Sequence, residues 1–320
     1  MNAKRVLAAV LFTLAAASAA AQTPSGGVTR IIVPFGAGGV QDILARSISA
    51  ELGTALGRSV IVENRAGAGG TIGTASVAKA APDGHTLILA AVSHTINGSL
   101  YAKLPYDPIR DFTGVAHIGT VEYVLMIGAA LPAKTVREFV DYAKANPGKL
   151  NYATAGSGSA THLSMAYFAG LVGIDMVHVP YKATNEAVNE VVAGRTHAVI
   201  AANIGALPFV KDARVRMLGV TSAKRSKFLP DLPTIAEAGV PGYEFDSWLG
   251  LLGPAGIPKP AVEQINAAIG TLLKDPVILD RLAKQGIEPK ALSPQAFNAL
   301  LRADFAKMAR VVKASGARVE

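Results

Sequence analysis

Three loops rich in glycine and serine lie where helices are expected to begin. They are residues 36–39, 67–73 and 156–161, and each follows an apolar run with strand character. The first turn of a helix leaves backbone N–H groups unpaired at the positive end of the helix dipole, so such a loop can hold an anion without a charged side chain. One loop of this kind could be only a tight turn, but three at strand ends favour anion binding, with carboxylate and phosphate fitting equally well.

Polar side chains stand beside these loops and could complete a binding site. Asp42 follows the first loop, where it could favour the helix dipole, orient the loop, or receive a ligand ammonium or hydroxyl group. Other hydrogen-bonding side chains follow the expected strands, namely Ser93, His94, Thr95, Asn97, Ser157, Ser159, Thr161, His162, Tyr181, Lys182, Thr184, Asn185 and Asn203.

The common signatures of catalysis are missing from the sequence. The second loop has the wrong glycine spacing for a dinucleotide fingerprint and lacks the Lys-Ser/Thr pair of a P-loop. Residues 156–159 do not fit the Gly-x-Ser-x-Gly nucleophile elbow, and the six histidines show no metal-ligand spacing. We therefore expect a binding protein with no enzymatic activity, no cofactor and no metal.

The elements that must position these loops alternate between strand and helix. Apolar runs at 30–34, 60–63 and 86–91 predict buried strands, with helical spacing at 43–56 and 72–80 between them. A second alternating block has strands at 150–153, 176–180, 197–202 and 216–221 and helices at 136–145, 162–171 and 185–193, and the tail is helical over 260–273, 275–284 and 294–314. The pattern is typical of two α/β lobes with parallel strands and crossover helices.

The first 21 residues resemble a secretory signal peptide. Lys4 and Arg5 precede a short apolar run, and Ala19 to Ala21 form a small-residue cleavage site. The chain has no cysteine, so the mature N-terminus cannot be lipidated, and we expect a periplasmic protein that is not lipid-anchored. Loss of Lys4 and Arg5 reduces the formal charge from +8 to +6. The basic residues are scattered, which favours a solvated surface over nucleic-acid binding.

Across its whole mature length the chain resembles the substrate-binding receptors of tripartite tricarboxylate transporters, also called Bug receptors. The matching stretches are IVPFGAGG at 32–39, VENRAGAGG at 62–70, PDGHTL at 82–87, LPYDP at 104–108, AKANPGKL at 143–150, HVPYK at 178–182, LPDLPT at 229–234, EAGVPG at 237–242 and WLG at 248–250.

This resemblance implies an α/β periplasmic binding protein of the Venus-flytrap, type II-like kind, with the ligand in a cleft between two lobes. We expect residues 22–122 plus 245–320 to form lobe 1 and residues 123–244 to form lobe 2. Family members bind carboxylated solutes through loop backbone, hydroxyl groups and water. The candidate binding residues carried over are Phe35, Gly38, Gly39, Asp42, Ser93, Ser157, Thr161, Tyr181, Asn185, Asn203 and Asp246.

The expected partners are a small carboxylate, either an organic acid or an amino acid, and the integral membrane subunits of a permease. We expect the protein to act as a monomer. Two alternatives remain open at this point. The first is a ligand-sensing subunit that presents its closed form to a signalling receptor, and the second is an exported hydrolase with a nucleophile such as Ser157.

Overall fold

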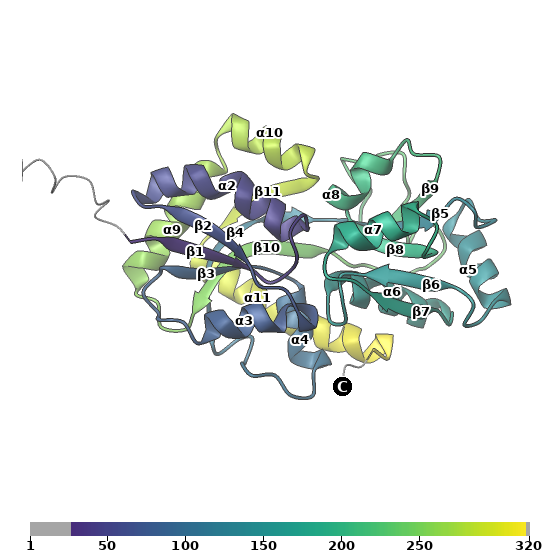
Figure 1. The fold of residues 1–320 in the computed structure, drawn as a ribbon, viewed down its shortest axis with the longest axis horizontal. Helices are drawn as coiled ribbons and strands as arrows, with labels where there is room; N and C mark the ends of the chain where they lie inside the picture. Colours follow the sequence, from purple (N-terminus) through teal and green to yellow (C-terminus); the bar gives the residue numbers. More distant parts are fainter. Residues whose placement is uncertain (1–26, 318–320) are drawn as a thin grey trace, which may run out of the picture.

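The computed structural model describes residues 27–317, which form two α/β lobes joined side by side (Figure 1). The predicted signal peptide lies outside the described residues. The fold class expected from the sequence is confirmed, because each lobe is a mixed sheet covered by helices. No helix within residues 27–317 is both long and apolar enough to cross a membrane.

The first lobe contains a six-stranded sheet in the order β11-β4-β10-β3-β1-β2. Its strands are β1 (Thr29–Val33), β2 (Val60–Asn64), β3 (Thr86–Ala91), β4 (Phe112–Val121), β10 (Ser247–Pro254) and β11 (Ile287–Leu292). Its helices are α2 (Val40–Leu56), α3 (Thr71–Ala78), α4 (Ser93–Leu100), α9 (Lys259–Leu272), α10 (Pro276–Lys284) and α11 (Pro294–Ser315), with the 3-10 turn η2 (Ala68–Gly70) before α3.

Strand β1 pairs in parallel with both β2 and β3, as the alternating sequence predicts. Ile31, Ile32 and Val33 are fully buried because helices cover both faces of the sheet (Figure 1). Helix α2 turns Leu44, Ile48 and Leu52 towards this core. The sheet therefore holds the start of α2 rigidly at the end of β1.

The second lobe contains a five-stranded sheet in the order β7-β6-β8-β5-β9. Its strands are β5 (Tyr123–Gly128), β6 (Asn151–Thr154), β7 (Val177–Pro180), β8 (Ala198–Ala202) and β9 (Val215–Val220). Its helices are α5 (Val136–Ala145), α6 (Ala160–Val172), α7 (Thr184–Val192) and α8 (Asn203–Ala206), followed by the turn η3 (Leu207–Phe209). Strand β6 is parallel to β7 and β8, while β5 is antiparallel to β8 and β9.

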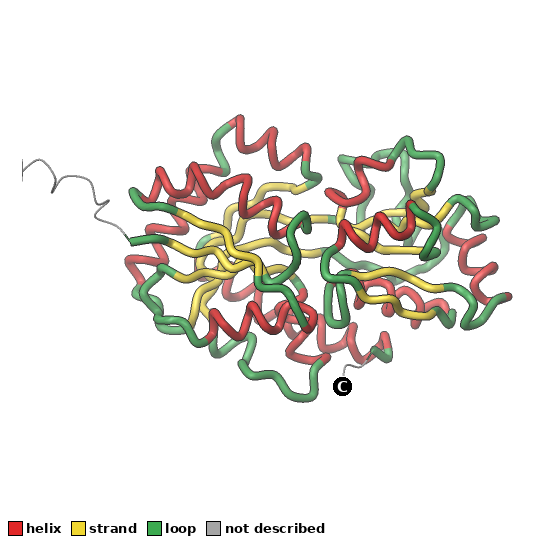
Figure 2. Tube along the Cα trace, in the orientation of Figure 1, coloured by secondary structure: helices red, strands yellow, loops and turns green. Residues whose placement is uncertain are grey.

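Two chain segments cross between the sheets. The first is Glu122, between β4 and β5, and the second is Phe245 with Asp246, just before β10. Thr221 connects both crossings, because its Oγ1 accepts a 3.0 Å hydrogen bond from the Tyr123 N–H and its carbonyl accepts a 2.9 Å bond from the Phe245 N–H. The loops that end the strands of both sheets meet between the lobes (Figure 2).

Two features differ from the sequence pattern. The strand predicted at 216–221 among parallel strands is β9, which is antiparallel to β5. Residues 93–100 form helix α4 rather than the end of a strand, although Thr95, Ile96, Asn97 and Gly98 have modest helix propensity. Packing supplies the stability, since α4 lies against α11 and Thr95 Oγ1 donates a 2.5 Å hydrogen bond to Asp304 Oδ2. Helix α11 contacts both lobes, because its last residues lie on α6 at Gly170.

The densest basic segment, around residues 211–227, is engaged in surface ion pairs. Arg214 pairs with Asp212 at 2.6 Å, Arg225 pairs with Glu237 at 3.0 Å, and Lys227 pairs with Glu288 at 2.7 Å. All three basic side chains are more than half exposed. Exposed pairs of this kind contribute little to stability, so the segment is a solvated face.

Candidate functional site

A small cavity lies where loops of the two lobes meet. Its lining consists of Phe35, Gly39, Val40, Gln41, Ser93, Tyr123, Ala155, Ser159, Ala160, Thr161 and Thr184. The cavity volume is about 20 Å³, which is room for about one water molecule. The lobes are also in direct contact beside it, because the Gly36 N–H donates a 3.2 Å hydrogen bond to the Lys182 carbonyl. The structure is therefore a closed form, and an organic ligand must enter after the lobes separate.

The first lobe presents the start of α2 to this cavity. Gly39 is the N-cap residue and has no side chain to cap the helix, while Ile43 N–H bonds back to the Gly39 carbonyl at 3.0 Å. Within residues 27–317 no protein group accepts a hydrogen bond from the N–H of Val40 or Gln41. Val40 and Gln41 line the cavity at the positive end of a 17-residue helix, which favours a negatively charged ligand.

Asp42 does not lie where it could contact a ligand in the cavity. Its Oδ2 accepts the Gly38 N–H at 2.9 Å, and its Oδ1 pairs with Arg46 Nε at 2.9 Å. Asp42 is buried and does not line the cavity. Both of its oxygens are engaged, so Asp42 orients the loop from behind, which is one of the roles the sequence suggested.

The second lobe presents the start of α6 in a similar way. Ser159 caps the helix, with its Oγ accepting the His162 N–H at 3.2 Å, and Thr161 Oγ1 accepts the Ala155 N–H at 2.8 Å. In the described part of the chain the N–H groups of Ala160 and Thr161 have no acceptor. The starts of α2 and α6 thus offer unpaired donors to one cavity from opposite lobes.

Two stacked histidines support the α6 loop from inside the second lobe. The rings of His162 and His178 lie 4.2 Å apart. His162 Nδ1 accepts the Gly158 N–H at 3.3 Å, and His178 Nε2 lies 2.6 Å from Thr154 Oγ1, which accepts the Gly156 N–H. Burial lowers the pKa of both rings to about 4, so both are neutral at pH 7 and His162 Nδ1 can act as an acceptor.

The lining carries no charged side chain, either acidic or basic. Charge recognition at this cavity therefore depends on backbone N–H groups, helix dipoles and the hydroxyl groups of Ser93, Tyr123 and Thr184. Among residues 27–317, no group of three or more His, Cys, Asp or Glu side chains is arranged to hold a metal ion.

The structure divides the predicted binding residues into two sets. Phe35, Gly39, Ser93 and Thr161 line the cavity. Gly38 lies against it, facing Asn185 of the second lobe, because a Cβ built on Gly38 would be 2.8 Å from Asn185 Nδ2. The remaining predicted residues lie outside the lining, and they are Asp42, Ser157, Tyr181, Asn185, Asn203 and Asp246.

Two of those outer residues have other partners, and a third lies where the chain crosses between the lobes. Tyr181 hydroxyl donates to Glu190 Oε2 at 3.3 Å, away from the cavity. Asn203 Nδ2 donates to Glu122 Oε2 at 3.2 Å beside the first crossing. Asp246 lies on the second crossing, where burial raises the pKa of its carboxyl to about 6.

Five residues that line the cavity were not predicted from the sequence, namely Val40, Gln41, Tyr123, Ala155 and Ala160. Ser159 and Thr184, which also line it, were predicted only as hydrogen-bonding side chains beside the loops. A signal for Val40 and Gln41 was present, because the first residues after a glycine N-cap must have unpaired N–H groups. Tyr123 gave no such signal, since its place depends on where the chain crosses between the lobes.

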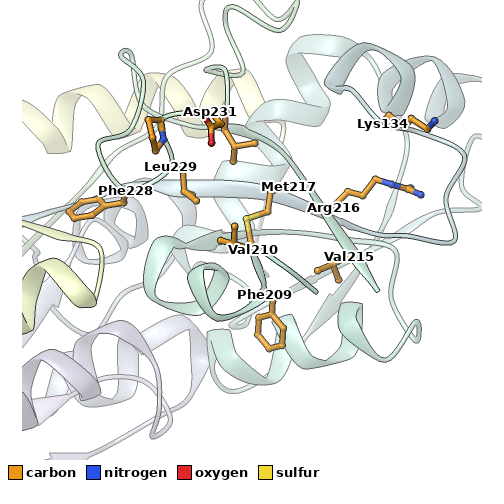
Figure 3. Close-up of a pocket in the computed structure, with 11 residues that line it drawn as sticks. Lys134, Phe209, Val210, Val215, Arg216, Met217, Phe228, Leu229 and Asp231 are labelled. Atoms are coloured by element: carbon orange, nitrogen blue, oxygen red, sulfur yellow. The ribbon is translucent and has the colours of Figure 1, made fainter. Parts of the chain in front are cut away.

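A larger hollow of about 430 Å³ lies on the second lobe beside β9 (Figure 3). Phe209, Met217 and Leu229 contribute to its largely apolar wall. Arg216 on its edge donates to the carbonyls of Leu131 at 2.9 Å and Ala133 at 3.2 Å. This hollow lacks the converging helix starts of the cavity between the lobes, so it is a poorer match to an anion site.

Known proteins of similar sequence and structure match nearly the full chain. The family described as "Tripartite tricarboxylate transporter family receptor" matches residues 44–317. A UPF0065 protein from the tcbD-tcbE intergenic region of Pseudomonas sp. (strain P51) is 36% identical and covers 97% of this chain and 93% of its own length.

Two similar solved structures are complexes with a carboxylate. R. palustris Rpa4515 with adipate has a TM-score of 0.87 and 35% identity, covering 92% of this chain and 99% of its own. MatC from Rhodopseudomonas palustris with bound malate has a TM-score of 0.85 and 33% identity, covering 90% and 99%. The chain therefore belongs to the tripartite tricarboxylate transporter receptor family of periplasmic solute-binding proteins.

Proposed function

We propose that this protein is an extracytoplasmic receptor that encloses a small carboxylate between its lobes and delivers it to a membrane permease. The observation that carries the proposal is the pair of open helix starts, α2 and α6, which face one cavity with no charged side chain in its lining. The adipate and malate bound by two similar receptors support a carboxylate as the ligand.

The closed form described above has room for about one water molecule, so in the proposed binding cycle the closed state with ligand has a wider cavity than this structure. A carboxylate first binds the Val40 and Gln41 N–H groups of the open protein, and the N–H groups of Ala160 and Thr161 complete the shell when the lobes close. Only the closed state makes both sets of contacts, so the ligand shifts the population towards closure. Movement is expected at the two crossings, with residues 22–122 plus 245–320 moving against residues 123–244.

The same lining favours an organic acid over an amino acid. An α-ammonium group needs an acceptor, preferably a carboxylate, and Asp42 already accepts the Gly38 N–H and pairs with Arg46. An ammonium beside the positive ends of two helices would also be repelled. We therefore propose that the ligand is a carboxylate without an amino group.

A thermal-shift assay with matched pairs of acids tests this function. The panel contains succinate with aspartate, glutarate with glutamate, adipate, malate, citrate, and the neutral amide of each acid that raises the melting midpoint. We expect at least one acid to raise the midpoint, its amide to have no effect, and the amino-substituted partner to bind more weakly in calorimetry. A midpoint raised only by phosphorylated or neutral compounds would overturn the carboxylate assignment.

Export and delivery have their own tests. We propose that residues 1–21 are removed on export, so the mature N-terminus read by mass spectrometry is expected to be Gln22. We also propose that the mature protein is a monomer, which light scattering tests directly. Cross-linking of the liganded protein in membranes is expected to capture a multi-helix permease subunit, whereas capture of a sensor-kinase ectodomain would favour the signalling alternative.

A further inference from the structure

The second glycine loop does not line the cavity but touches the other lobe. In this loop Gly69 has a left-handed φ of 61°, and a Cβ built on it would be 3.1 Å from Gly158 Cα and would overlap the Ser157 carbonyl oxygen. The backbones of the two lobes are therefore in van der Waals contact here, and only a residue without a side chain fits in the closed form.

Tyr101, the residue after α4, connects the same two loops. Its hydroxyl oxygen lies 2.8 Å from the Ala68 carbonyl oxygen in the first lobe and 3.1 Å from the Ser157 carbonyl oxygen in the second. One hydroxyl proton is shared between two acceptors, each on a different lobe. Burial raises the pKa of Tyr101, so the hydroxyl keeps this proton at neutral pH.

Asn97, one helical turn before Tyr101, fixes the first-lobe side of this contact. Its Nδ2 donates a 3.0 Å hydrogen bond to the Gly69 carbonyl. Helix α4 in turn lies against α11, which packs on both lobes. Loop 67–70 is thus held in place before the lobes meet.

The contact bears on the binding cavity through the α6 loop. Ser157 is two residues before Ser159, the N-cap of α6, and the N–H groups of Ala160 and Thr161 follow directly. A hydrogen bond to the Ser157 carbonyl restrains the loop that aims those donors. Neither Tyr101 nor loop 67–70 lines the cavity, so this restraint is independent of the ligand's identity.

We propose that Tyr101 and residues 67–70 form a closing contact that positions the α6 loop and sets ligand affinity without touching the ligand. The proposal rests on the proposed function, since affinity has meaning only if a ligand is enclosed. It assigns the second glycine loop to lobe closure, whereas the first glycine loop binds the anion.

The first test compares Tyr101→Phe with Tyr167→Phe. The Tyr167 hydroxyl also donates to a backbone carbonyl, that of Gly242 at 3.4 Å, but both residues belong to the second lobe. Loss of one hydrogen bond corresponds to about a 2- to 12-fold change in an equilibrium constant. We expect Tyr101→Phe to raise Kd by such a factor through faster dissociation, equally for every acid bound, while Tyr167→Phe leaves Kd unchanged.

The second test blocks closure by steric overlap. Gly69→Ala places a methyl group against Ser157 and Gly158, whereas Gly57→Ala is a matched control with a similar φ of 65° and no atom within 4 Å of the added Cβ. Both variants carry similar backbone strain, so a difference in binding between them reports the contact between lobes. We expect Gly69→Ala to bind at least about tenfold more weakly than Gly57→Ala.

Closure itself can be followed with spin labels, because the chain contains no cysteine. Labels at Lys79→Cys in the first lobe and Lys149→Cys in the second, both exposed positions, report the distance between lobes. Without ligand, we expect the closed population to decrease in Tyr101→Phe and to vanish in Gly69→Ala. Equal distance distributions in wild type and both variants would overturn the closing contact.

These outcomes separate the two proposals. A wild-type protein that binds no carboxylate would overturn the proposed function. The distances between labels without ligand would still show whether Tyr101 holds the lobes closed. If carboxylates bind but Tyr101→Phe and Tyr167→Phe have equal affinities, the proposed function stands and the closing contact is wrong.

Discussion

Residues 36–39 and 67–70 have the same sequence, Gly-Ala-Gly-Gly, yet they occupy different places in the molecule. The first tetrapeptide ends at the N-cap of α2, and the two residues after it present unpaired N–H groups to the cavity. The second forms the turn η2 and lies against Ser157 and Gly158 of the other lobe.

Local chemistry explains part of this difference. Four residues after Gly38, Asp42 accepts its N–H and fixes the first loop in an open form with extended Gly39. Four residues after Gly70, Thr74 Oγ1 donates to the Gly70 carbonyl at 2.8 Å instead. The second loop has three glycines with left-handed φ and Ala68 at φ 46°, so it coils tightly and presents its backbone surface to the other lobe.

The comparison shows that a glycine loop at a helix start exposes backbone groups, but that its own sequence does not determine what those groups contact. We propose that the first loop binds the ligand and that the second loop contacts the other lobe when the protein closes. The predictions below test that distinction, beginning with the largest expected effect on ligand binding.

Val40→Pro removes one cavity-facing N–H while keeping the helix start. Proline is accommodated at the first helical position, and Gly39 already has the extended conformation that a residue before proline requires, with φ −77° and ψ 167°. Loss of a charge-assisted hydrogen bond is expected to raise Kd about 10- to 150-fold in calorimetry.

Two controls define this result. Val40→Ala loses the same buried side chain but keeps the N–H, so we expect it to lower the melting midpoint with little effect on Kd. Thr71→Ala, at the first helical position after the second glycine loop, is expected to leave Kd within about twofold. Equal loss of binding in Val40→Pro and Val40→Ala would contradict the role of the Val40 N–H as a donor to the ligand.

Acid is expected to weaken the folded state through His162. Its pKa of about 4 lies below the ordinary 6.5, so the stability that depends on the neutral ring is fully present above pH 6.5 and is lost as the pH falls from 6.5 towards 4. Protonated His162 cannot accept the Gly158 N–H, and we expect this ring to lower the free energy of unfolding by about 2 kcal/mol between pH 7 and pH 4.5, as measured with urea.

His162→Gln is the variant for this pH experiment, because glutamine does not titrate. We expect its free energy of unfolding to vary less between pH 4.5 and 7 than that of the wild type. The same pH profile of stability in both proteins would contradict the role of His162.

Asp42→Ala is expected to raise Kd by about 3- to 10-fold, because the Gly38 N–H loses its acceptor and the first loop is no longer fixed. Arg46→Gln keeps this acceptor but loses the ion pair with Asp42 and the 2.8 Å hydrogen bond from Arg46 Nη2 to Asn64 Oδ1. Since the Arg46 side chain is 52% exposed, we expect that variant to bind within about twofold of wild type. Equal Kd values for the two variants would contradict the loop-orienting role.

Asp246→Asn is expected to change stability but not ligand affinity. Burial raises the folded-state pKa of Asp246 from 3.8 to about 6, so its carboxyl favours the folded state when protonated and loses stability as the pH rises from about 4 to 6. We expect the variant to gain about 2 kcal/mol in the free energy of unfolding at pH 7.5 and little at pH 4, as measured with urea. A raised Kd would instead favour Asp246 as a ligand contact.

Much of the fold could be predicted from the sequence because its signals are local. The helical spacing of Leu44, Ile48 and Leu52 and the apolar run at 31–33 predicted α2 and β1 close to their observed bounds. The helix at 93–100 could not be predicted, because its stability comes from α11, about 200 residues later in the chain.

Some residues of the candidate site could likewise be predicted from local signals, and others could not. Phe35, Gly39, Ser93 and Thr161 were selected because they lie at strand ends and helix starts, and all four line the cavity. Tyr123 lies there only because β4 runs directly into β5 across the lobes, and Tyr101 joins two loops that are far apart in the sequence. No local pattern carries information about either contact.

The amino-acid sequence alone determined the family, the alternating α/β elements and the glycine loops from which helices start. The family follows from the motifs that the chain shares with its members, while the elements and loops follow from hydrophobic period and backbone freedom, which act over a few residues. Only the tertiary structure decided which of the two identical tetrapeptides lies at the cavity and which lies against the other lobe. That choice depends on how two separately built sheets meet, and so on contacts between residues distant in the chain.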